Sequence, residues 1–335
     1  MKVYIKGMSY YLPDTVLSNE DIEKSFPEWT ADKISAKIGV DKRHIASKDE
    51  TSSDMAIEAG KLLFEEYNIS PKDIDFVLLC TQSPDYFLPT SACVVQEKLN
   101  IPTKAGAVDF NLGCSGYVYG LAVAKGLIAA GIVKNILLIT SETYSKYIHS
   151  KDKGNKTIFG DAAAATLISN DGFAEIMDFN LGTDGSGANN LIVESGCLRH
   201  PKPLDNLRFD ESNNPVSSDH LYMNGTEILS FTLEMVPLLV KETLDKNNLE
   251  ISDVDRFVFH QANKHILNFL RKKIKIPKEK FIIEMNKTGN TVSSTIPIAI
   301  KECLKKGNIK KNQKVMIAGF GVGYSWAGSI LNFVR

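Results

Sequence analysis

The chain has 335 residues, of which 43% are hydrophobic and 24% are charged, and it carries a formal net charge of −1. This length allows two ordinary domains or one large duplicated domain, and the composition is typical of a globular protein. The balanced charge speaks against a protein that binds nucleic acid or an anionic membrane surface.

The sequence also limits the compartment and the cofactors. No apolar stretch reaches the roughly 20 residues needed to cross a bilayer, and the amino-terminal residues lack the apolar core of a signal peptide. The five cysteines are an odd number and do not have the spacing of metal ligands. We therefore expect a cytoplasmic protein with reduced thiols, no membrane segment and no metal site.

Strands and helices alternate along the first half of the chain. We expect a strand over 3–8, then helices over 19–26 (capped by Asn19), 29–38 and 52–67 (capped by the segment 52–54). A buried strand over 75–81, a helix over 89–99, and strands over 105–110 and 135–140 follow. An alanine-rich segment from 158 should end as a strand near 168. The lysine-rich segment 301–314 is expected to form a solvated helix face and a loop.

Cys114 occupies the turn between the strand over 105–110 and an apolar helix over 117–128. A thiol in the first turn of a helix faces unpaired N–H groups and the positive end of the helix dipole, which lower its pKa. Gly113 and Gly116 should leave room for a substrate to approach the sulfur. The alternative is a small buried apolar cysteine without a chemical role.

The second half of the chain repeats the first at a constant offset of 180 residues. Without a gap, 68–80 aligns with 248–260, the strand over 135–140 aligns with 315–320, and Cys114 aligns with Ser294. We predict two halves, 1–172 and 173–335, that pack about a pseudo-twofold axis as mixed, largely parallel sheets covered by helices.

The repeat brings two further residues toward Cys114. His260 ends a strand of the second half, and Asn290 precedes the helix equivalent to the one that follows Cys114. A cysteine that becomes acylated, with two neutral hydrogen-bond donors that stabilise a thioester enolate, can perform acyl chemistry. The alternatives are a core histidine for His260 and an ordinary turn residue for Asn290.

A glycine-rich segment, 319–328, follows the last buried strand. Such a segment can be a simple tight turn. After a strand that faces the Cys114 helix, it could instead direct a backbone N–H, together with that of Cys114, at an oxyanion.

Four motifs together resemble the beta-ketoacyl-acyl carrier protein synthase III family. They are Asn111-Leu-Gly-Cys114-Ser-Gly, Phe259-His260-Gln-Ala-Asn263, Lys287-Thr-Gly-Asn290-Thr and Gly319-Phe-Gly-Val-Gly-Tyr-Ser-Trp326. The resemblance extends over nearly the whole chain. It implies an α/β protein with the thiolase-like duplicated αβαβα five-layer fold, acting as a homodimer.

The resemblance also implies a reaction, in which an acyl-CoA starter undergoes Claisen condensation with malonyl-acyl carrier protein. Cys114 resembles the nucleophile, and His260 and Asn290 resemble the pair that promotes decarboxylation. Phe320 resembles the ring beside the carboxylate of the extender. Val322 stands at the position, usually glycine, whose N–H completes the oxyanion hole. No cofactor is implied besides these substrates.

A substrate path is implied by the same resemblance. Trp29 corresponds to the ring that stacks on adenine, and Lys37 and Lys153 replace arginines of the CoA site. Asn263 would hydrogen-bond the pantetheine arm. Leu88 falls where a side chain reaches across the dimer to close the acyl pocket. Lys264 would dock the carrier protein, because His265 replaces the usual arginine there.

Two other functions stay open at this point. The acyl group on Cys114 could pass to an oxygen or nitrogen nucleophile in a specialised pathway. The chain could also be a non-catalytic partner subunit. The presence of His260 and Asn290 favours condensation, because transfer to a heteroatom does not require a stabilised malonyl carbanion.

Overall fold

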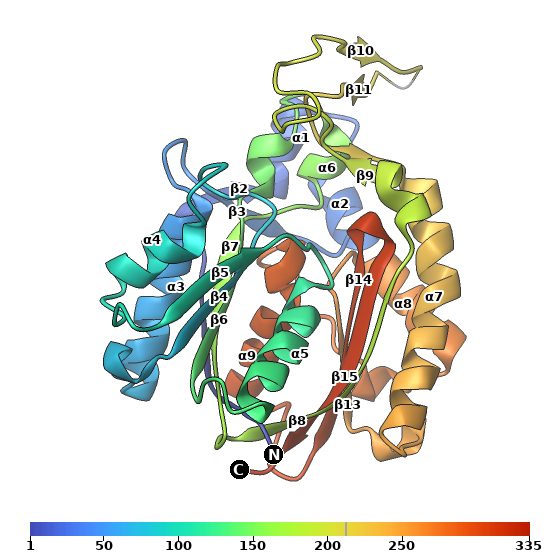
Figure 1. The fold of residues 1–335 in the computed structure, drawn as a ribbon. Helices are drawn as coiled ribbons and strands as arrows, with labels where there is room; N and C mark the ends of the chain where they lie inside the picture. The colour runs from blue at the N-terminus through green and yellow to red at the C-terminus, as the bar shows by residue number, and fades with distance from the viewer. Residues whose placement is uncertain (212) are drawn as a thin grey trace.

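The computed structural model describes residues 1–211 and 213–335. It contains two halves of a sheet that enclose a central helical layer, with further helices on both outer faces (Figure 1). This five-layer arrangement confirms the predicted α/β thiolase-like fold.

Nine strands form one hydrogen-bonded sheet in the order β13-β14-β15-β8-β1-β7-β6-β4-β5. Three of its eight neighbouring pairs are parallel and five are antiparallel, so the sheet is mixed but not largely parallel as predicted. One antiparallel pair arises because the short turn between β14 and β15 reverses the chain, and β1 adds two more because it runs opposite to both of its neighbours, β7 and β8. Strands β1 and β8 pair antiparallel through Tyr4–Glu175 and Ile5–Ala174, and this short ladder joins the two halves of the sheet. The strands are β1 (Tyr4–Tyr11), β4 (Phe76–Cys80), β5 (Gly106–Phe110), β6 (Ile136–Glu142), β7 (Ala162–Ser169), β8 (Ala174–Thr183), β13 (Arg256–Phe259), β14 (Lys314–Gly321) and β15 (Ser325–Phe333).

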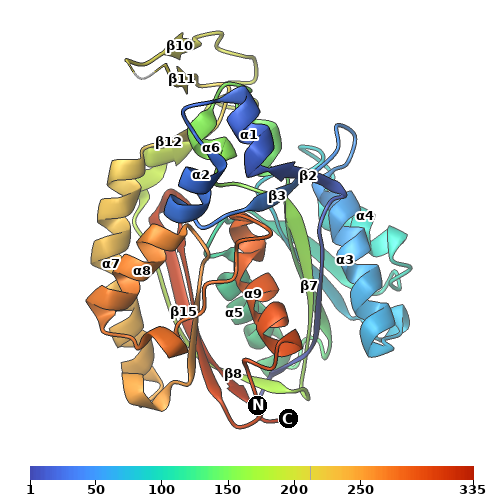
Figure 2. The same ribbon diagram turned by 180° about the vertical axis from the view of Figure 1, so that it is seen from behind.

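Three helical layers cover these halves, as Figures 1 and 2 show from opposite sides. The central layer is formed by α5 (Gly116–Ala129) and α9 (Thr295–Lys305), whose apolar side chains belong to one buried cluster. One outer layer consists of α3 (Ser52–Tyr67) and α4 (Ser91–Lys98), and the other of α7 (Gly225–Lys246) and α8 (Lys264–Ile274). The central helices therefore have no broad solvated face, which explains why α5 is rich in alanine and leucine.

Shorter elements gather at one end of the molecule (Figure 2). They are β2 (Thr15–Ser18), α1 (Asn19–Ser25), α2 (Ala31–Lys37), β3 (Lys42–Ile45), α6 (Lys153–Lys156), β9 (Leu191–Ile192), β10 (Arg208–Phe209), β11 (Pro215–Val216) and β12 (Tyr222–Met223). The β10–β11 hairpin projects beyond the body at that end. No helix in 1–211 or 213–335 is long and apolar enough to cross a membrane.

Equivalent elements of the two halves keep the offset of 180 residues. The 3₁₀ helices η1 (Pro71–Asp73) and η4 (Ile251–Asp253) correspond residue for residue, and β4 corresponds to β13. The boundary between 172 and 173 stays a prediction. It lies in the turn between β7 and β8.

Two predicted helix caps are wrong. Helix α1 is capped by Ser18, whose hydroxyl accepts the N–H of Asp21 at 3.2 Å, while Asn19 is buried and donates to the Val40 carbonyl. Helix α3 is capped by Thr51 and not by the segment 52–54. In both cases the residue one position earlier forms a reciprocal capping box with an aspartate three residues later, which satisfies two helix-end donors.

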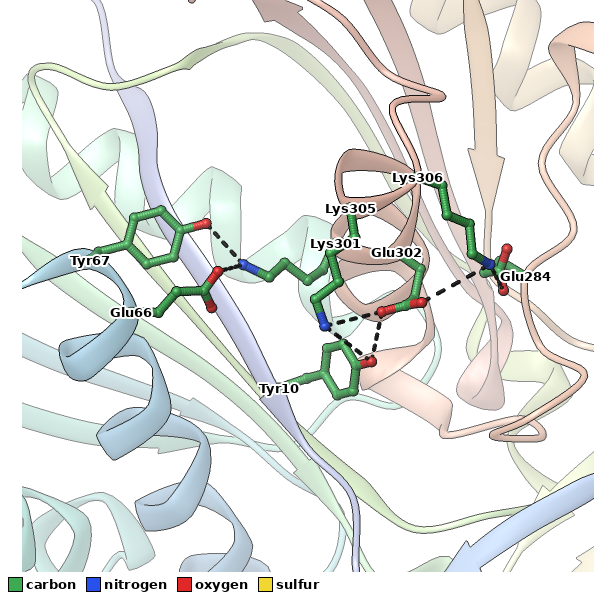
Figure 3. A network of polar contacts seen from close by, with 8 residues as sticks. All are labelled: Tyr10, Glu66, Tyr67, Glu284, Lys301, Glu302, Lys305 and Lys306. Carbon is green, nitrogen blue, oxygen red and sulfur yellow. Dashed lines mark hydrogen bonds and ion pairs between the residues drawn. The ribbon is translucent and has the colours of Figure 1, made fainter.

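The prediction of a solvated lysine face over 301–314 is wrong for Lys301, which is 4% exposed. Its ammonium donates to the Glu66 carboxylate and to the Tyr67 hydroxyl, and thereby links α9 to α3 (Figure 3). In the same network Tyr10 of β1 donates to Glu302 at 2.7 Å. This network therefore ties the carboxyl-terminal half of α9 to β1 and α3.

Candidate active site

Six predicted site residues, from both halves of the chain, line a single cavity of about 520 Å³. They are Lys37, Cys114, His260, Asn263, Asn290 and Phe320. The turn before α5 supplies Cys114, the end of β13 leads to His260, and β14 supplies Phe320. The cavity therefore lies where the carboxyl ends of strands from both halves meet, as the repeat predicts.

Cys114 lies just before α5 and not in its first turn, because the helix begins at Gly116 and Ser115 is its cap residue. The predicted lowering of the pKa of the thiol is also wrong. Burial, and after it the nearby Glu142 carboxylate, raise the pKa of Cys114 to about 12. The backbone N–H groups of Val322 and of Cys114 itself oppose this rise. Cys114 is thus a thiol at neutral pH, and the N–H groups beside it favour negative charge on the sulfur.

Close packing explains the glycines around the sulfur, with one correction. A side chain at Gly116 would collide with the Cys80 sulfur, and one at Gly113 would meet Gln82 and Val322 at 2.6 Å. These two glycines therefore permit packing and do not open a path for the substrate. The glycine that leaves space at the nucleophile is Gly321, where a Cβ atom would lie 2.9 Å from the Cys114 sulfur.

Asn290 and His260 are held so that their side-chain nitrogens face each other. The Asn290 Oδ1 accepts the backbone N–H of Val292 at 2.9 Å, which turns Nδ2 toward the imidazole. The separation of Asn290 Nδ2 and His260 Nε2 is 3.5 Å, long for a strong hydrogen bond. This distance is suitable for two nitrogens that both donate to one acceptor atom lying between them.

A threonine that the sequence analysis missed orients the imidazole. His260 Nδ1 lies 2.8 Å from the Thr295 hydroxyl, which also lies 3.0 Å from the Val292 carbonyl. Burial lowers the pKa of His260 to about 3, so the ring is neutral at physiological pH. A neutral imidazole donates from Nε2 only when Nδ1 is an acceptor. The Thr295 hydroxyl has one proton, which it donates to the Val292 carbonyl, so it supplies the hydrogen bond to Nδ1 when that O–H turns from the carbonyl to the imidazole. The signal was present in the sequence, since Thr295 follows Asn290 by five residues at the start of a helix.

The glycine-rich segment after β14 lies against the same site. The Phe320 ring meets the His260 ring edge to face, with centroids 5.8 Å apart. A Cβ atom at Gly319 would lie 2.7 Å from the Cys114 carbonyl oxygen and from Ser115 Cα, so the glycine permits close packing there. The hydroxyls of Ser115 and Ser325 form a hydrogen bond of 2.5 Å. These contacts bring the Val322 N–H to the Cys114 sulfur.

Backbone strain is concentrated at the edge of this site. Val292 has a φ of 53° and Tyr324 has a φ of 43°, values that β-branched and aromatic residues rarely adopt. Val292 follows Asn290 by two residues and donates the N–H that orients it. Such strain persists where the surrounding structure imposes it, and it is common at functional sites.

Trp29 and Lys153 line a second, adjacent cavity of about 340 Å³. Ile158 and Met223 line both cavities and mark where they meet. The Lys153 ammonium forms an ion pair with Glu28 at 3.0 Å. The outer wall comes from the β10–β11 hairpin and its flanks, which the sequence analysis missed because short, polar strands give no periodic signal.

Leu88 and Lys264 lie outside these cavities. Leu88 is 82% exposed and follows the exposed Tyr86 and Phe87 in a wide hollow of about 910 Å³, which Val322 also lines. Lys264 is exposed at the first position of α8, where its N–H donates to the Ile38 carbonyl. Asn263 caps that helix through Oδ1, which accepts the Ile266 N–H at 2.8 Å and leaves Nδ2 for another partner.

Family models match both halves of the chain. Residues 108–185 match the model described as 3-Oxoacyl-[acyl-carrier-protein (ACP)] synthase III, and residues 244–333 match the model of its C-terminal part. The two matches include Cys114, His260 and Asn290.

Full-length relatives have similar sequences and folds. The chain is 36% identical to the Beta-ketoacyl-[acyl-carrier-protein] synthase III of Clostridium perfringens, with 97% of each chain covered. It is 46% identical to a crystal structure of a 3-oxoacyl-(acyl-carrier-protein) synthase III, with a TM-score of 0.97 over 99% of this chain and 100% of the other. A 3-oxoacyl-(acyl-carrier protein) synthase from Burkholderia xenovorans LB400 is 35% identical, with a TM-score of 0.91 over 100% of this chain and 95% of the other.

Proposed function

Because the chain belongs to the 3-oxoacyl-[acyl-carrier-protein] synthase III family of condensing enzymes, we propose that Cys114 accepts an acyl group from acyl-CoA and that His260 and Asn290 then promote its condensation with malonyl-acyl carrier protein. The product is a 3-oxoacyl thioester, as in the initiation of fatty-acid synthesis. The observation that carries the residue assignment is the convergence of all three side chains on one cavity.

In the first half-reaction the Cys114 sulfur attacks the thioester carbonyl of acyl-CoA. The new carbon–sulfur bond forms, the bond to the CoA sulfur breaks, and the proton of the Cys114 thiol leaves with CoA. The N–H groups of Val322 and Cys114 stabilise the oxyanion of the tetrahedral intermediate. The high pKa of the thiol is compatible with this step, because those donors act on charge that develops only during the attack.

In the second half-reaction the malonyl thioester loses carbon dioxide, and the electron pair of the broken bond moves into an enolate. His260 Nε2–H and Asn290 Nδ2–H donate to the enolate oxygen, consistent with their separation of 3.5 Å. Phe320 places an apolar ring beside the leaving carboxylate and favours its departure as neutral carbon dioxide. The enolate carbon then attacks the acyl carbonyl and expels the Cys114 thiolate.

The two adjoining cavities suit a long substrate. Trp29 and Lys153 would hold the nucleotide end of CoA, and Lys37 and Asn263 would line the path of the pantetheine arm toward Cys114. The exposed Lys264 would attract an acidic carrier protein to the mouth of that path. Neither half-reaction as written requires a metal or a resident cofactor.

The exposed apolar segment at Tyr86, Phe87 and Leu88 supports a homodimer. Three consecutive large apolar side chains in solvent are characteristic of a protein–protein interface. In a dimer, Leu88 would close the acyl pocket of the partner. Light scattering coupled to size-exclusion chromatography would give the mass of a dimer, and Leu88→Asp should shift it toward that of a monomer.

Product analysis tests the proposed function. The protein, acetyl-CoA and malonyl-acyl carrier protein should yield acetoacetyl-acyl carrier protein, carbon dioxide and free CoA in equal amounts. An acylated Cys114 that forms without any carbon dioxide release would instead support transfer to an oxygen or nitrogen nucleophile. Absence of both acylation and product would support a non-catalytic subunit.

A further inference from the structure

A buried carboxylate joins the two catalytic segments and is not used in the steps above. Glu142 is the last residue of β6, and its side chain is 0% exposed. Its Oε1 accepts the Ser293 hydroxyl at 2.7 Å, and its Oε2 accepts the Gln82 backbone N–H at 3.0 Å. Both donors are uncharged, so neither neutralises the charge of the carboxylate. A fully buried carboxylate held in this way is costly, and its presence requires an explanation.

One side of the carboxylate supports the nucleophile. Gln82, whose N–H it accepts, directs its own side chain at the segment before Cys114. The Gln82 amide donates to Asn111 Oδ1 at 3.0 Å, and its Oε1 lies so close to Gly113 that a Cβ atom there would approach it to 2.6 Å. Tyr144 donates to that same oxygen at 2.5 Å and fixes the amide. Glu142 thus holds the turn that presents Cys114.

The other side supports the decarboxylation pair. Ser293 belongs to the 3₁₀ turn Val292–Ser294, which begins two residues after Asn290 and leads into the helix that begins with Thr295. Val292, in the same turn, orients Asn290 and has a strained φ of 53°. The Ser293–Glu142 hydrogen bond therefore connects this strained turn of the second half to a strand of the first half.

The charge of Glu142 also reaches the nucleophile. An ionised Glu142 acts on a group of weak acids around it and raises the pKa of each. These groups are Cys80, Cys114, Tyr144 and Tyr147. Glu142 itself has a pKa raised to about 8, chiefly by burial and to a lesser degree by the charge of Asp161, while hydrogen bonds from Gln82, Ser293 and Ser83 lower it. The carboxyl therefore changes its charge in a range where the enzyme can be assayed.

We propose that Glu142 is a positioning residue that couples the two half-sites: its hydrogen bonds with Gln82 and Ser293 hold the turn before Cys114 in register with the Asn290 turn. The inference rests on the proposed function for its effect on decarboxylation. The effect on the thiolate can be measured without any substrate. A neutral Glu142 favours acylation of Cys114, whereas its hydrogen bonds support the later step.

Two variants separate these effects. Glu142→Gln removes the charge and leaves one amide oxygen to accept from two donors, so both effects should change. Ser293→Ala removes the link to the Asn290 turn and keeps the carboxyl group, so decarboxylation should slow, while the Glu142 charge is still acquired, at a higher pH. Glu58→Gln, on the exposed face of α3, is the matched control for a glutamate-to-glutamine change.

The first measurement is the rate of Cys114 alkylation by iodoacetamide between pH 6 and 10, followed by mass spectrometry of the Cys114 peptide. Peptide analysis is needed because Cys197 is exposed and will react as well. Below pH 7 Glu142→Gln and wild type should react alike, and above pH 9 the variant should react about 10-fold faster. Glu58→Gln should follow the wild-type profile, which should itself flatten near pH 8. In Ser293→Ala the flattening should move to a higher pH, because the Ser293 hydroxyl lowers the pKa of Glu142. Profiles of wild type and Glu142→Gln that run parallel throughout would overturn the role of the charge.

The second measurement is radiolabelled carbon dioxide released from malonyl-acyl carrier protein per acylated enzyme. Ser293→Ala and Glu142→Gln should each reduce this ratio about 5- to 10-fold, the effect of one lost hydrogen bond that aligns a donor. Thermal unfolding verifies that each variant is folded. If Glu142→Gln does not fold, Ser293→Ala still tests whether the hydrogen bond positions the Asn290 turn. The wild-type alkylation profile still tests whether the Glu142 charge affects the Cys114 thiol. A wild-type ratio in folded Ser293→Ala would overturn the positioning role, whereas no release from wild type would count against the proposed function instead.

Discussion

Asn290 Nδ2 and His260 Nε2 lie 3.5 Å apart inside the cavity that also holds Cys114, and each is oriented by a hydrogen bond on its other side. This relationship joins a loop and a strand end of the second half with Cys114, the proposed nucleophile, of the first. It predicts that the two donors act on one oxygen, after Cys114 has been acylated.

Replacement of either donor should separate the two half-reactions. His260→Ala and Asn290→Ala should each still form acyl-Cys114, but should release carbon dioxide from malonyl thioester more slowly by about 10²–10³-fold. The double variant should lose less than the product of the two effects, because both donors serve the same oxygen. Undiminished release in both single variants would exclude the decarboxylation role.

Thr295 should determine which imidazole nitrogen carries the proton. Thr295→Val removes the hydroxyl 2.8 Å from His260 Nδ1 and should slow decarboxylation about 10-fold, with little effect on acylation. Thr295→Ser keeps the hydroxyl and is the control, so its rate should stay near that of wild type. A slow serine variant would indicate that the methyl group and not the hydrogen bond matters.

Cys114 should be the residue that carries the acyl group. Incubation with acetyl-CoA should add the mass of one acetyl group to the wild-type protein, on the peptide that contains Cys114. Cys114→Ala should show no such adduct, whereas Cys197→Ser should be acylated like wild type although Cys197 is the exposed thiol. An adduct that persists in Cys114→Ala would move the nucleophile elsewhere.

Lys264 should contribute to docking of the carrier protein. Lys264→Glu should raise the KM for malonyl-acyl carrier protein about 3- to 10-fold at low salt and leave acylation by acetyl-CoA unchanged. Lys61→Glu, on the opposite outer layer of the molecule, tests whether a charge reversal anywhere has the same effect. Equal losses in both half-reactions would indicate a general defect instead of lost docking.

The buried His260 should make stability depend on pH. Burial lowers its pKa to about 3 in the folded protein, whereas in the unfolded chain it binds a proton near pH 6.5. The unfolded state therefore gains a proton first as the pH falls, and stability is lost below about pH 6.5, by about 1.4 kcal/mol per pH unit. Urea titrations between pH 6 and 4 would give the free energy of unfolding of wild type and of His260→Gln. We expect the free energy to fall with decreasing pH less steeply in His260→Gln, with slopes that differ by about 1.4 kcal/mol per pH unit. Equal slopes would mean that the imidazole is not held neutral.

Much of the site could be predicted from the order of residues along the chain. The constant offset of 180 residues, the small-residue turn at Cys114 and the positions of His260 and Asn290 at element ends indicate a duplicated α/β fold with one shared site. Such features can be recognised in sequence because strand ends, helix starts and repeats are local patterns. The caps at Ser18 and Thr51 were missed by one residue, because neighbouring polar residues compete for the same helix end.

Only the tertiary structure decided the pKa values of the site residues and the hydrogen bonds that orient them. Helix position alone predicts a lowered pKa for Cys114, but burial and Glu142 raise it, and both depend on what packs around the sulfur. Likewise, Lys301 belongs to a lysine-rich segment and is nevertheless buried against α3. The Thr295–His260 and Ser293–Glu142 hydrogen bonds join residues 35 and 151 positions apart. Desolvation and long-range hydrogen bonds depend on three-dimensional neighbours, which a local pattern does not contain.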